Sequence, residues 1–236
     1  MKINMIIMTK KYFIIPARKG SKGIKDKNIS NLGGHPLFVW SLIHAKYMLS
    51  KGDEIIFSSD SDEYLEIASD YTSKLIKRDK TLSDDNASTE SVMIDSLRNF
   101  LLADTDDIIL LQPTSPFRYK DTLNKFLAII ESGSESTLTV KETHPFVWEE
   151  SENGLYKKLF SERLPRQIAN PTYIETGSIY HVKSEFFGKH KIRNKEYSNI
   201  LITEEIENID IDSYIDLELS KVYVEDYKSE WSDFNI

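Results

Sequence analysis

The stretch YFIIPARKGSKGIKDKN, residues 12–28, decides how the rest of the sequence is interpreted. Residues 12–15 are four consecutive apolar side chains ended by Pro16, which is typical of a short buried strand. The loop that follows holds two glycines, a serine, one arginine and four lysines. Glycines let backbone N–H groups approach an anion, and clustered cations neutralise several phosphate charges. The stretch predicts a strand followed by a phosphate-binding loop; the alternative is a basic loop that is merely solvated.

The overall charge makes this local cluster informative. The chain of 236 residues has 38 acidic against 30 basic side chains and a net charge of −8. Such a surface does not attract nucleic acid or anionic membranes as a whole, so a triphosphate site has to concentrate positive charge locally. The loop matches neither the Walker motif nor the dinucleotide motif G-x-G-x-x-G. The absence of cysteine excludes disulfides, thiolate metal sites and a cysteine nucleophile.

The N-terminus carries no recognisable targeting segment. Its apolar stretch is short, Lys10 and Lys11 interrupt it, and no small-residue cleavage site follows. No apolar run approaches the length that a bilayer crossing needs. We therefore expect a cytoplasmic protein with neither a membrane nor a nucleic acid as partner.

Strand-like and helix-like segments alternate along the first 140 residues. This order predicts a mostly parallel sheet covered by helices on both faces, a Rossmann-like three-layer α/β fold. Ligands of such sheets bind at the carboxyl ends of the strands, where the loops at Arg18, Asp60 and Gln112 would lie. The expected strands are 12–15, 54–57, 74–77, 108–111 and 137–140, and the expected helices are 36–51, 61–71, 88–103 and 120–132.

The alternation is interrupted between about residues 142 and 170. Three prolines and a polar stretch indicate an excursion from the sheet within a single domain spanning residues 1–236, not a second domain. Strands are expected again at 178–180 and 206–211, and a last helix near Ser213. Large apolar residues in the excursion would be costly to expose. We therefore expect this extension to pack against the same segment of a second chain in a homodimer.

A polar turn follows the strand at 108–111. Gln112, Thr114 and Ser115 present an amide and two hydroxyls, which suit hydrogen bonds to a sugar or a base. The alternative is an ordinary proline turn at the end of a sheet.

Two further motifs carry charge. In the expected strand 206–211, alternation would place Asp210 and Asp212 on the same side, where a cation such as Mg²⁺ could neutralise them. Alternatively, Asp212 caps the next helix and Asp210 is solvated. Residues 163–167 include Arg163 and Arg166, whose planar guanidinium groups suit a carboxylate. The alternative there is a pair of surface arginines.

Taken together and in this order, these motifs resemble the acylneuraminate cytidylyltransferase family, whose members make CMP-activated nonulosonic acids. The resemblance runs from about Phe13 to about Tyr223, and no single piece of it is specific. Its pieces are 15–18, 20–23, 27–28, 59–60, Arg78, 82–89, 111–116, Arg118, 165–167, 177–180 and 209–212.

The resemblance implies a role for each matching residue. Arg18 and Lys27 would contact the triphosphate of CTP, while Ala17, Ser21, Lys22 and Asn28 would line the nucleotide loop, with Arg78 and Thr89 near the cytosine. Gln112, Thr114 and Ser115 would face the sugar, and Arg166 and Gln167 would bind its acidic part. Asp210 and Asp212 would hold Mg²⁺, and with Arg18 and Lys27 they form the implied catalytic set.

The implied reaction is attack by the C2 hydroxyl of an acidic nine-carbon sugar on the α-phosphate of CTP, in the biosynthesis of cell-surface polysaccharides. Residues 176–178 read Thr-Gly-Ser where the family often has Asn-Gly-Ala, and Ile174 and Glu175 stand near the place of an arginine found in some sialic acid enzymes. A neuraminic, legionaminic or pseudaminic sugar is therefore equally compatible.

Two other functions remain as alternatives. An enzyme for the eight-carbon sugar Kdo shares a similar first loop, but residues 27–28 and 165–167 fit the nonulosonate pattern better. A non-catalytic nucleotide-binding protein on the same fold would be favoured by loss of Lys27, Asp210 or Asp212, all of which are present.

Overall fold

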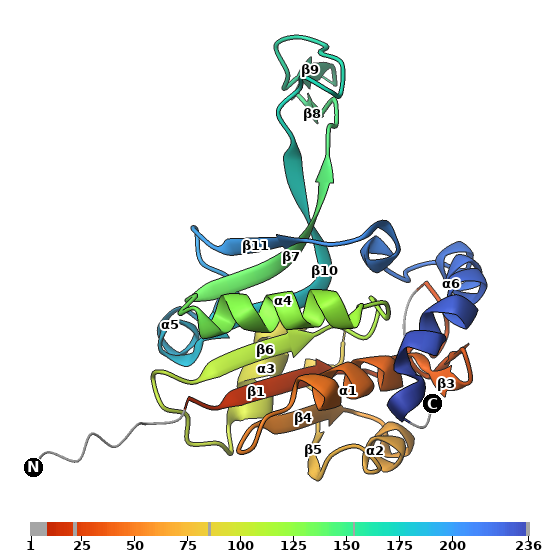
Figure 1. Cartoon of the computed structure of the whole chain (residues 1–236), viewed down its shortest axis with the longest axis vertical. Coiled ribbons are helices and arrows are strands. Elements are labelled where there is room, and N and C mark those ends of the chain that lie inside the picture. The colour runs from red at the N-terminus through yellow and green to blue at the C-terminus, as the bar shows by residue number, and fades with distance from the viewer. Residues whose placement is uncertain (1–8, 21–22, 85, 153, 235–236) are drawn as a thin grey trace, which may run out of the picture.

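A seven-stranded sheet forms the centre of the protein in the computed structural model, which describes residues 9–20, 23–84, 86–152 and 154–234 (Figure 1). The strand order is β11-β7-β10-β6-β1-β4-β5. Only β10 runs antiparallel to its neighbours in this sheet. The sequence-based prediction of a mostly parallel α/β sheet is thus confirmed. The strands are β1 (Lys11–Pro16), β4 (Glu54–Ser59), β5 (Lys74–Lys77), β6 (Asp107–Leu111), β7 (Ser136–Thr143), β10 (Thr172–Lys183) and β11 (Asn199–Ile202).

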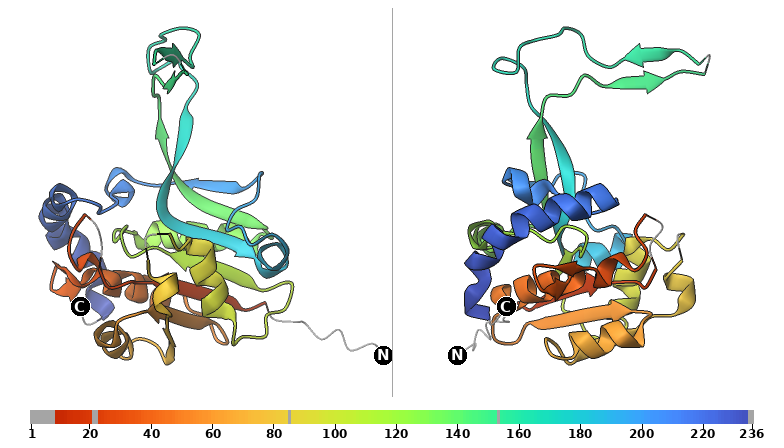
Figure 2. Two further views of the ribbon diagram at one scale, coloured as in Figure 1. Left: turned by 180° about the vertical axis from the view of Figure 1, so that it is seen from behind. Right: turned by 90° about the vertical axis from the view of Figure 1, so that its right-hand side faces the viewer.

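Strand β1 shows why both faces of the sheet are covered. Its side chains alternate, so that Phe13 and Ile15 join one apolar core while Tyr12 and Ile14 join the other. Helices α1 and α4 pack on the first face, which is in front in Figure 1, and α3 and α5 pack on the second, seen from behind in Figure 2. The helices are α1 (Leu37–Met48), α2 (Asp62–Ala68), α3 (Thr89–Leu97), α4 (Lys120–Glu131) and α5 (Ser184–His190).

Several segments depart from the sequence-based expectation, β11 among them, since no strand was expected at residues 199–202. Residues 206–211 do not form the expected strand. A 3-10 helix, η3 (Glu205–Asn208), begins there instead, and a capping box between Glu204 and Glu207 satisfies its N-terminal N–H groups. Helix α3 ends at Leu97 instead of near residue 103, and Leu101, which lies beyond that end, is fully exposed. Helix α1 starts one residue after Pro36, which belongs to a small hairpin of β2 (Asn31–Leu32) and β3 (His35–Pro36).

The stretch expected to leave the sheet stands away from the body in every view (Figures 1 and 2). Strands β7 and β10 continue beyond the sheet as a two-stranded stalk that pairs Lys141 with Ile174 and Thr143 with Thr172. The stalk carries a small hairpin of β8 (Trp148–Glu150) and β9 (Tyr156–Lys158). We call residues 144–171 the extension. Its aromatic rings pack together, with centroids of Phe146 and Phe160 5.1 Å apart.

The C-terminal segment returns to the first face of the sheet. Helix α6 (Tyr214–Tyr227) and the 3-10 helix η4 (Lys228–Phe234) lie there, and Tyr227 and Trp231 are buried against α1. Helix α6 begins immediately after the loop that carries Asp210 and Asp212. Among the described residues, no helix combines the length and apolar character needed to cross a membrane.

Candidate active site

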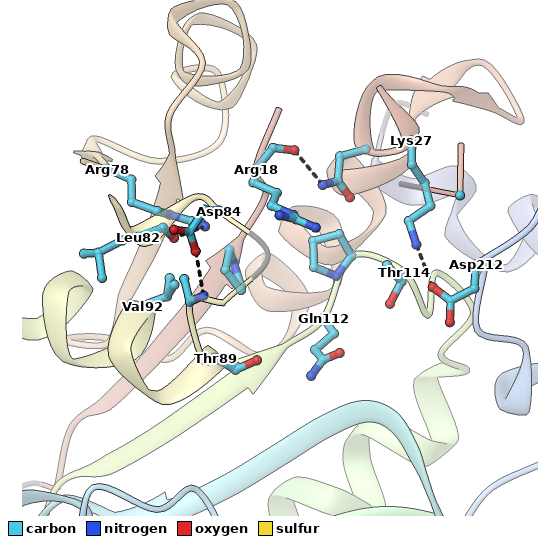
Figure 3. A pocket seen from close by; sticks show the side chains of 15 residues that line it. Arg18, Lys27, Arg78, Leu82, Asp84, Thr89, Val92, Gln112, Thr114 and Asp212 are labelled. Carbon is cyan, nitrogen blue, oxygen red and sulfur yellow. Dashed lines mark hydrogen bonds and ion pairs between the residues drawn. The ribbon is translucent and has the colours of Figure 1, made fainter. Parts of the chain in front are cut away.

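A pocket of about 380 Å³ opens where the parallel strands β1 and β6 end (Figure 3). The first loop, the turn after β6 and the segment between β5 and α3 all reach it, as expected for ligand sites at the carboxyl edge of such a sheet. The lining residues are Pro16, Arg18, Gly23, Lys27, Asn28, Arg78, Leu82, Asp84, Ala87, Thr89, Val92, Gln112, Pro113, Thr114 and Asp212.

The first loop wraps one end of this pocket. Asn28 donates from Nδ2 to the carbonyl oxygen of Arg18 over 3.0 Å, which joins the two ends of the loop. Arg18 in turn donates from Nη1 to the carbonyl oxygen of Ser83 over 3.1 Å. Ala17 is buried, and its N–H donates to the carbonyl oxygen of Ser58, so it fixes the start of the loop without lining the pocket.

Lys27 connects the first loop to the loop before α6. Its side chain is buried, and Nζ donates to the carbonyl oxygen of Ile211 over 2.5 Å and to Oδ1 of Asp212 over 2.9 Å. Gly23 allows the first loop to approach the loop before α6 closely, because a Cβ at this position would overlap the carbonyl oxygen of Asp212. A cation predicted from the first motif and a carboxylate predicted from the third therefore lie side by side.

Asp212 does not cap the following helix. The N-cap of α6 is Ser213, whose hydroxyl accepts from the N–H of Asp216 while the Asp216 carboxylate accepts from the N–H of Ser213. With its capping alternative excluded, Asp212 is left with a side chain that points into the pocket (Figure 3) and remains 76% exposed.

Asp210 lies close to Asp212 although the strand that was predicted to align them does not form. The Ile211 N–H donates to the carbonyl oxygen of Thr114 over 2.8 Å and so holds this loop against the turn after β6. Loss of hydration raises the pKa of Asp210, and the negative charge of Asp212 raises that pKa further, while a hydrogen bond from Thr114 and the charge of Lys27 act in the opposite direction. Asp210 is therefore near enough to Asp212 to be affected by its negative charge, although it does not line the pocket itself.

Arg118 fixes the turn after β6 from the interior of the protein. This guanidinium is buried and donates from Nη2 to the carbonyl oxygens of Gln112, over 2.7 Å, and Ser178, over 3.0 Å. Burial lowers the pKa of Arg118 to about 10, so that it stays charged at neutral pH. Gln112 and Thr114 consequently reach the pocket on a rigid turn, whereas Ser115 is buried beneath it.

Arg78 and Thr89 line the side of the pocket that is formed by the segment between β5 and the start of α3. Arg78 is buried and donates from Nη2 to the carbonyl oxygen of Ser58 over 2.7 Å and from Nε to the Ser58 hydroxyl over 3.2 Å. Burial lowers its pKa to about 10, which still leaves it charged. Thr89 is the first residue of α3 and lies at the same end of the pocket as Gln112 (Figure 3).

Of the predicted residues that the structure describes, Ala17, Ser115, Asp210, Arg166 and Gln167 do not line this pocket. Ser21 and Lys22 lie outside the described residues. Arg166 and Gln167 lie in the extension, where both are exposed and neither lines the pocket of its own chain. Arg163, the alternative to Arg166, stacks on Phe146 with its guanidinium carbon 4.6 Å from the ring centroid. The sugar-binding set is therefore divided in a single chain: Gln112 and Thr114 are at the pocket, and Arg166 and Gln167 are outside it.

Sequence reasoning missed several residues of the site. Gly177 has a φ of +75° at a bulge in β10, and a Cβ there would lie 3.8 Å from Oδ2 of Asp210 and 3.9 Å from Oε1 of Gln112. A glycine inside a strand pattern is a usable signal for such a bulge. Asp84 also lines the pocket and accepts from the N–H groups of Asn86 and Ala87. The role of His44 beneath the turn, where its Nδ1 meets Arg118 Nη1 at 3.1 Å, has no sequence signal.

Known proteins resemble this chain over most of its length. The CMP-N,N'-diacetyllegionaminic acid synthase of Legionella pneumophila is 32% identical, over 90% of this chain and 95% of the relative. The pseudaminic acid cytidylyltransferase of Campylobacter jejuni serotype O:2 is 31% identical, over 89% and 94%.

Among solved structures, CMP:2-keto-3-deoxy-manno-octonic acid synthetase in complex with CTP has the same fold. The TM-score is 0.62 at 13% identity, with 92% of this chain and 99% of that one covered. The sequence profile of the cytidylyltransferase family matches residues 12–229. This chain belongs to the cytidylyltransferase family.

Proposed function

We propose that this cytidylyltransferase transfers CMP from CTP to the C2 hydroxyl of a nonulosonic acid of the neuraminic, legionaminic or pseudaminic type and releases pyrophosphate. The observation that carries the proposal is the meeting of Arg18 and Lys27, the Gln112 turn and Asp212 in one pocket. The activities named for the two relatives, which are 32% and 31% identical to this chain, support this class of sugar.

The nucleotide would occupy the part of the pocket between the first loop and α3. Arg18 and Lys27 supply positive charge for the triphosphate, and Asn28 keeps the loop closed around it. Lys27 uses two of its three N–H donors on Ile211 and Asp212, so one donor remains for a phosphate oxygen. Arg78 and Thr89 border the place proposed for the cytosine.

The acidic pair suits Mg²⁺. Hard cations of this size prefer oxygen ligands and commonly take one or two carboxylates, with substrate phosphates and water completing the shell. The described residues contain no group of three or more histidine, cysteine, aspartate or glutamate side chains that could hold a metal by itself. Asp210 and Asp212 would therefore bind Mg²⁺ together with the phosphates. When bound, the ion would neutralise phosphate charge.

The protein's own contribution to the reaction is positioning. Gln112 and Thr114 stand on a turn that Arg118 fixes from inside the fold, next to the bulge at Gly177. A sugar held there would present its C2 hydroxyl to the α-phosphate without a further conformational search, which is the main source of rate in such a transfer. Lys27 would stabilise the charge that develops on the phosphate oxygens.

The acidic end of the sugar requires a cation, and the cations among the described lining residues, Arg18, Lys27 and Arg78, are assigned to the nucleotide in this proposal. Arg166 is the proposed clamp for this carboxylate, since it makes no hydrogen bond or ion pair within the described part of the chain and its planar fork can engage both oxygens. Because Arg166 stands in the extension, we propose that the enzyme is a homodimer in which the extension serves the neighbouring subunit. A cytoplasmic location belongs to the same proposal, because CTP is a cytoplasmic substrate.

The two alternatives are less well supported. The likeness to the octonic acid synthetase rests on 13% identity, so it supports a common fold and not a common sugar. A non-catalytic role would not require Lys27, Asp210 and Asp212 to be kept together beside the pocket.

Identification of the product tests the proposed reaction. The protein would be incubated with CTP, Mg²⁺ and each candidate sugar, and the product examined by ³¹P NMR and mass spectrometry. We expect a single phosphodiester resonance of a CMP-sugar and an equal amount of pyrophosphate. Nucleotide that returns unchanged with every nonulosonic acid would contradict the proposal, provided that the protein is folded by circular dichroism.

A further inference from the structure

Glu207 is a buried carboxylate that the proposed reaction does not use directly. Its side chain is only 1% exposed, and it does not line the pocket. Oε1 accepts from the N–H of Tyr119 over 2.8 Å, while Oε2 accepts from the hydroxyl of Thr122 over 2.9 Å and from the N–H of Glu204 over 3.0 Å. A buried charge is costly unless it is hydrogen-bonded, and these three donors occupy both oxygens.

This one carboxylate serves the N-termini of two helices. Glu204 is the N-cap of η3, and Tyr119 is the N-cap of α4, where the Tyr119 side chain makes no capping hydrogen bond. The first N–H groups of a helix have no partner within the helix, and a negative charge near them is favourable. Glu207 therefore caps its own helix and also α4, which joins two segments 88 positions apart in the sequence.

The joint between η3 and α4 fixes one end of the loop that carries the acidic pair. Asp210 and Asp212 follow Glu207 by three and five residues. The loop is held again at Ile211, whose N–H donates to the turn after β6 and whose carbonyl oxygen accepts from Lys27. The backbone of the pair is thus anchored on the side of α4 by Glu207 and on the side of the pocket by Ile211.

The start of α4 also supports the turn that carries Gln112. Tyr119 comes directly after Arg118, whose guanidinium donates to the carbonyl oxygen of Gln112 over 2.7 Å. The acidic loop and the Gln112 turn therefore share one support, and Glu207 sets the place of the acidic loop on it. Transfer reactions that depend on positioning lose rate when such a distance changes slightly.

We propose that Glu207 is a positioning residue that holds Asp210 and Asp212 where they can bind a divalent cation together with the phosphates of CTP. The inference rests on the proposed function and deepens it, because it assigns the geometry of the acidic pair to a residue that contacts neither cation nor substrate. A carboxylate that only stabilised the fold would leave the affinity for the cation unchanged, so the two roles can be separated by measurement.

Binding of Mn²⁺ tests the inference without turnover. Mn²⁺ prefers the same oxygen ligands as Mg²⁺, and its binding to the protein with CTP and no sugar can be followed by electron paramagnetic resonance. Glu207→Gln keeps the size of the side chain, but its amide nitrogen must face a donor that the carboxylate accepted from. We expect the Kd for Mn²⁺ to rise by about tenfold, the usual cost of disturbing the orientation of metal ligands.

Two further measurements make the result specific. The Kd for CTP in EDTA, measured by calorimetry, should be the same for Glu207→Gln and the wild type, because the nucleotide loop does not contact Glu207. Glu205→Gln removes an exposed carboxylate from the same 3-10 helix and should leave both constants unchanged. Thr122→Val removes one donor to Glu207 with little change of shape and should raise the Kd for Mn²⁺ in the same direction.

The outcomes separate this inference from the proposed function. A lower melting temperature with an unchanged Kd for Mn²⁺ in Glu207→Gln would overturn the positioning role, and the acidic pair would stand if Asp212→Asn still weakens Mn²⁺ binding. Should circular dichroism show that Glu207→Gln is unfolded, Thr122→Val decides, and an unchanged Kd for Mn²⁺ there would also overturn the inference. A wild type that binds no Mn²⁺ in the presence of CTP would overturn both the metal pair and the role of Glu207.

Discussion

Lys27 and Asp212 are 185 positions apart in the sequence, and their contact organises the pocket at the residue scale. The ammonium group of Lys27 is buried, whereas the Asp212 carboxylate is largely exposed. Two N–H donors of Lys27 therefore fix the loop before α6, while Asp212 keeps a free oxygen toward the pocket. Each residue has both a structural contact and a proposed role with the phosphates.

Replacing Lys27 tests the cationic role. Lys27→Ala removes a charge-assisted contact worth about 1.5–3 kcal/mol, and about 1.4 kcal/mol corresponds to a factor of ten in rate. We expect kcat/KM for CTP to fall at least tenfold. Lys25→Ala removes an exposed lysine from the same loop and is the matched control. Equal values of kcat/KM for the two variants would remove Lys27 from the nucleotide site.

Replacing Asp212 tests the acidic pair. Asp212→Asn keeps the shape and a weaker partner for Lys27 but lowers the negative charge that a divalent cation would meet. We expect loss of most activity with an unchanged melting temperature, and partial recovery when Mg²⁺ is raised. Asp70→Asn, at an exposed position after α2, is the control. Wild-type turnover in EDTA after removal of all divalent metal would show that the pair holds no catalytic cation.

Arg166 and Arg163 can be separated by the same conservative change. Arg166→Lys keeps the charge and loses the fork, so we expect a marked rise in KM for the sugar and nearly unchanged CTP binding. Arg163→Lys alters a guanidinium that stacks on Phe146 and should leave the sugar KM close to wild type. An equal loss for CTP and sugar in Arg166→Lys would show that it is no dedicated carboxylate clamp, and a sugar effect confined to Arg163→Lys would transfer the role to Arg163.

At the scale of elements, a buried hydrogen-bond network of His44, Arg118 and Tyr227 joins α1, the turn after β6 and α6. Arg118 can only donate, so Nδ1 of His44 accepts from its Nη1 at 3.1 Å, and the ring proton stands on Nε2, which donates to the Tyr227 hydroxyl over 2.7 Å. Tyr227 donates in turn to the carbonyl oxygen of Arg118 over 2.8 Å. This chain of donors positions Gln112 from beneath.

This hydrogen-bond network predicts that the free energy of unfolding depends on pH. Burial, and then the charge of Arg118, hold the pKa of His44 well below its ordinary value of 6.5. The folded state therefore binds fewer protons than the unfolded chain, and the stability that depends on neutral His44 is complete above pH 6.5 and is lost as the pH falls below it. The NMR spectrum at pH 5.5 should show the neutral Nε2–H tautomer. An imidazolium signal from His44 in the folded protein at that pH would contradict this assignment.

The elements also show what the sequence could predict. The buried strands at 12–15 and 108–111 were recognisable because local apolar runs determine them. The strand expected at 206–211 was wrong: Ile206 packs on the core from the 3-10 helix η3, and Ile209 and Ile211 do so from the loop that follows it. The first loop and the Gln112 turn were predictable as local motifs. The buried support from Arg118 and His44 was not, since it depends on tertiary contacts between distant segments.

At the scale of the whole molecule, the protein consists of a compact body and an extension that stands away from it (Figures 1 and 2). The body contains the pocket proposed for the nucleotide, and the extension contains Arg166 and Gln167. A dimer in which each extension serves the other body would join the two parts. Its mass would be twice the 27.3 kDa of one chain.

The central claim is that the acceptor is a nonulosonic acid. The most direct measurement is pyrophosphate release from CTP and Mg²⁺ with neuraminic, legionaminic, pseudaminic and Kdo sugars, each compared by kcat/KM. We expect at least one nine-carbon acid to exceed Kdo by a factor of ten or more, and no release without sugar. Preferential release with Kdo, or equal release with and without any sugar, would contradict the account.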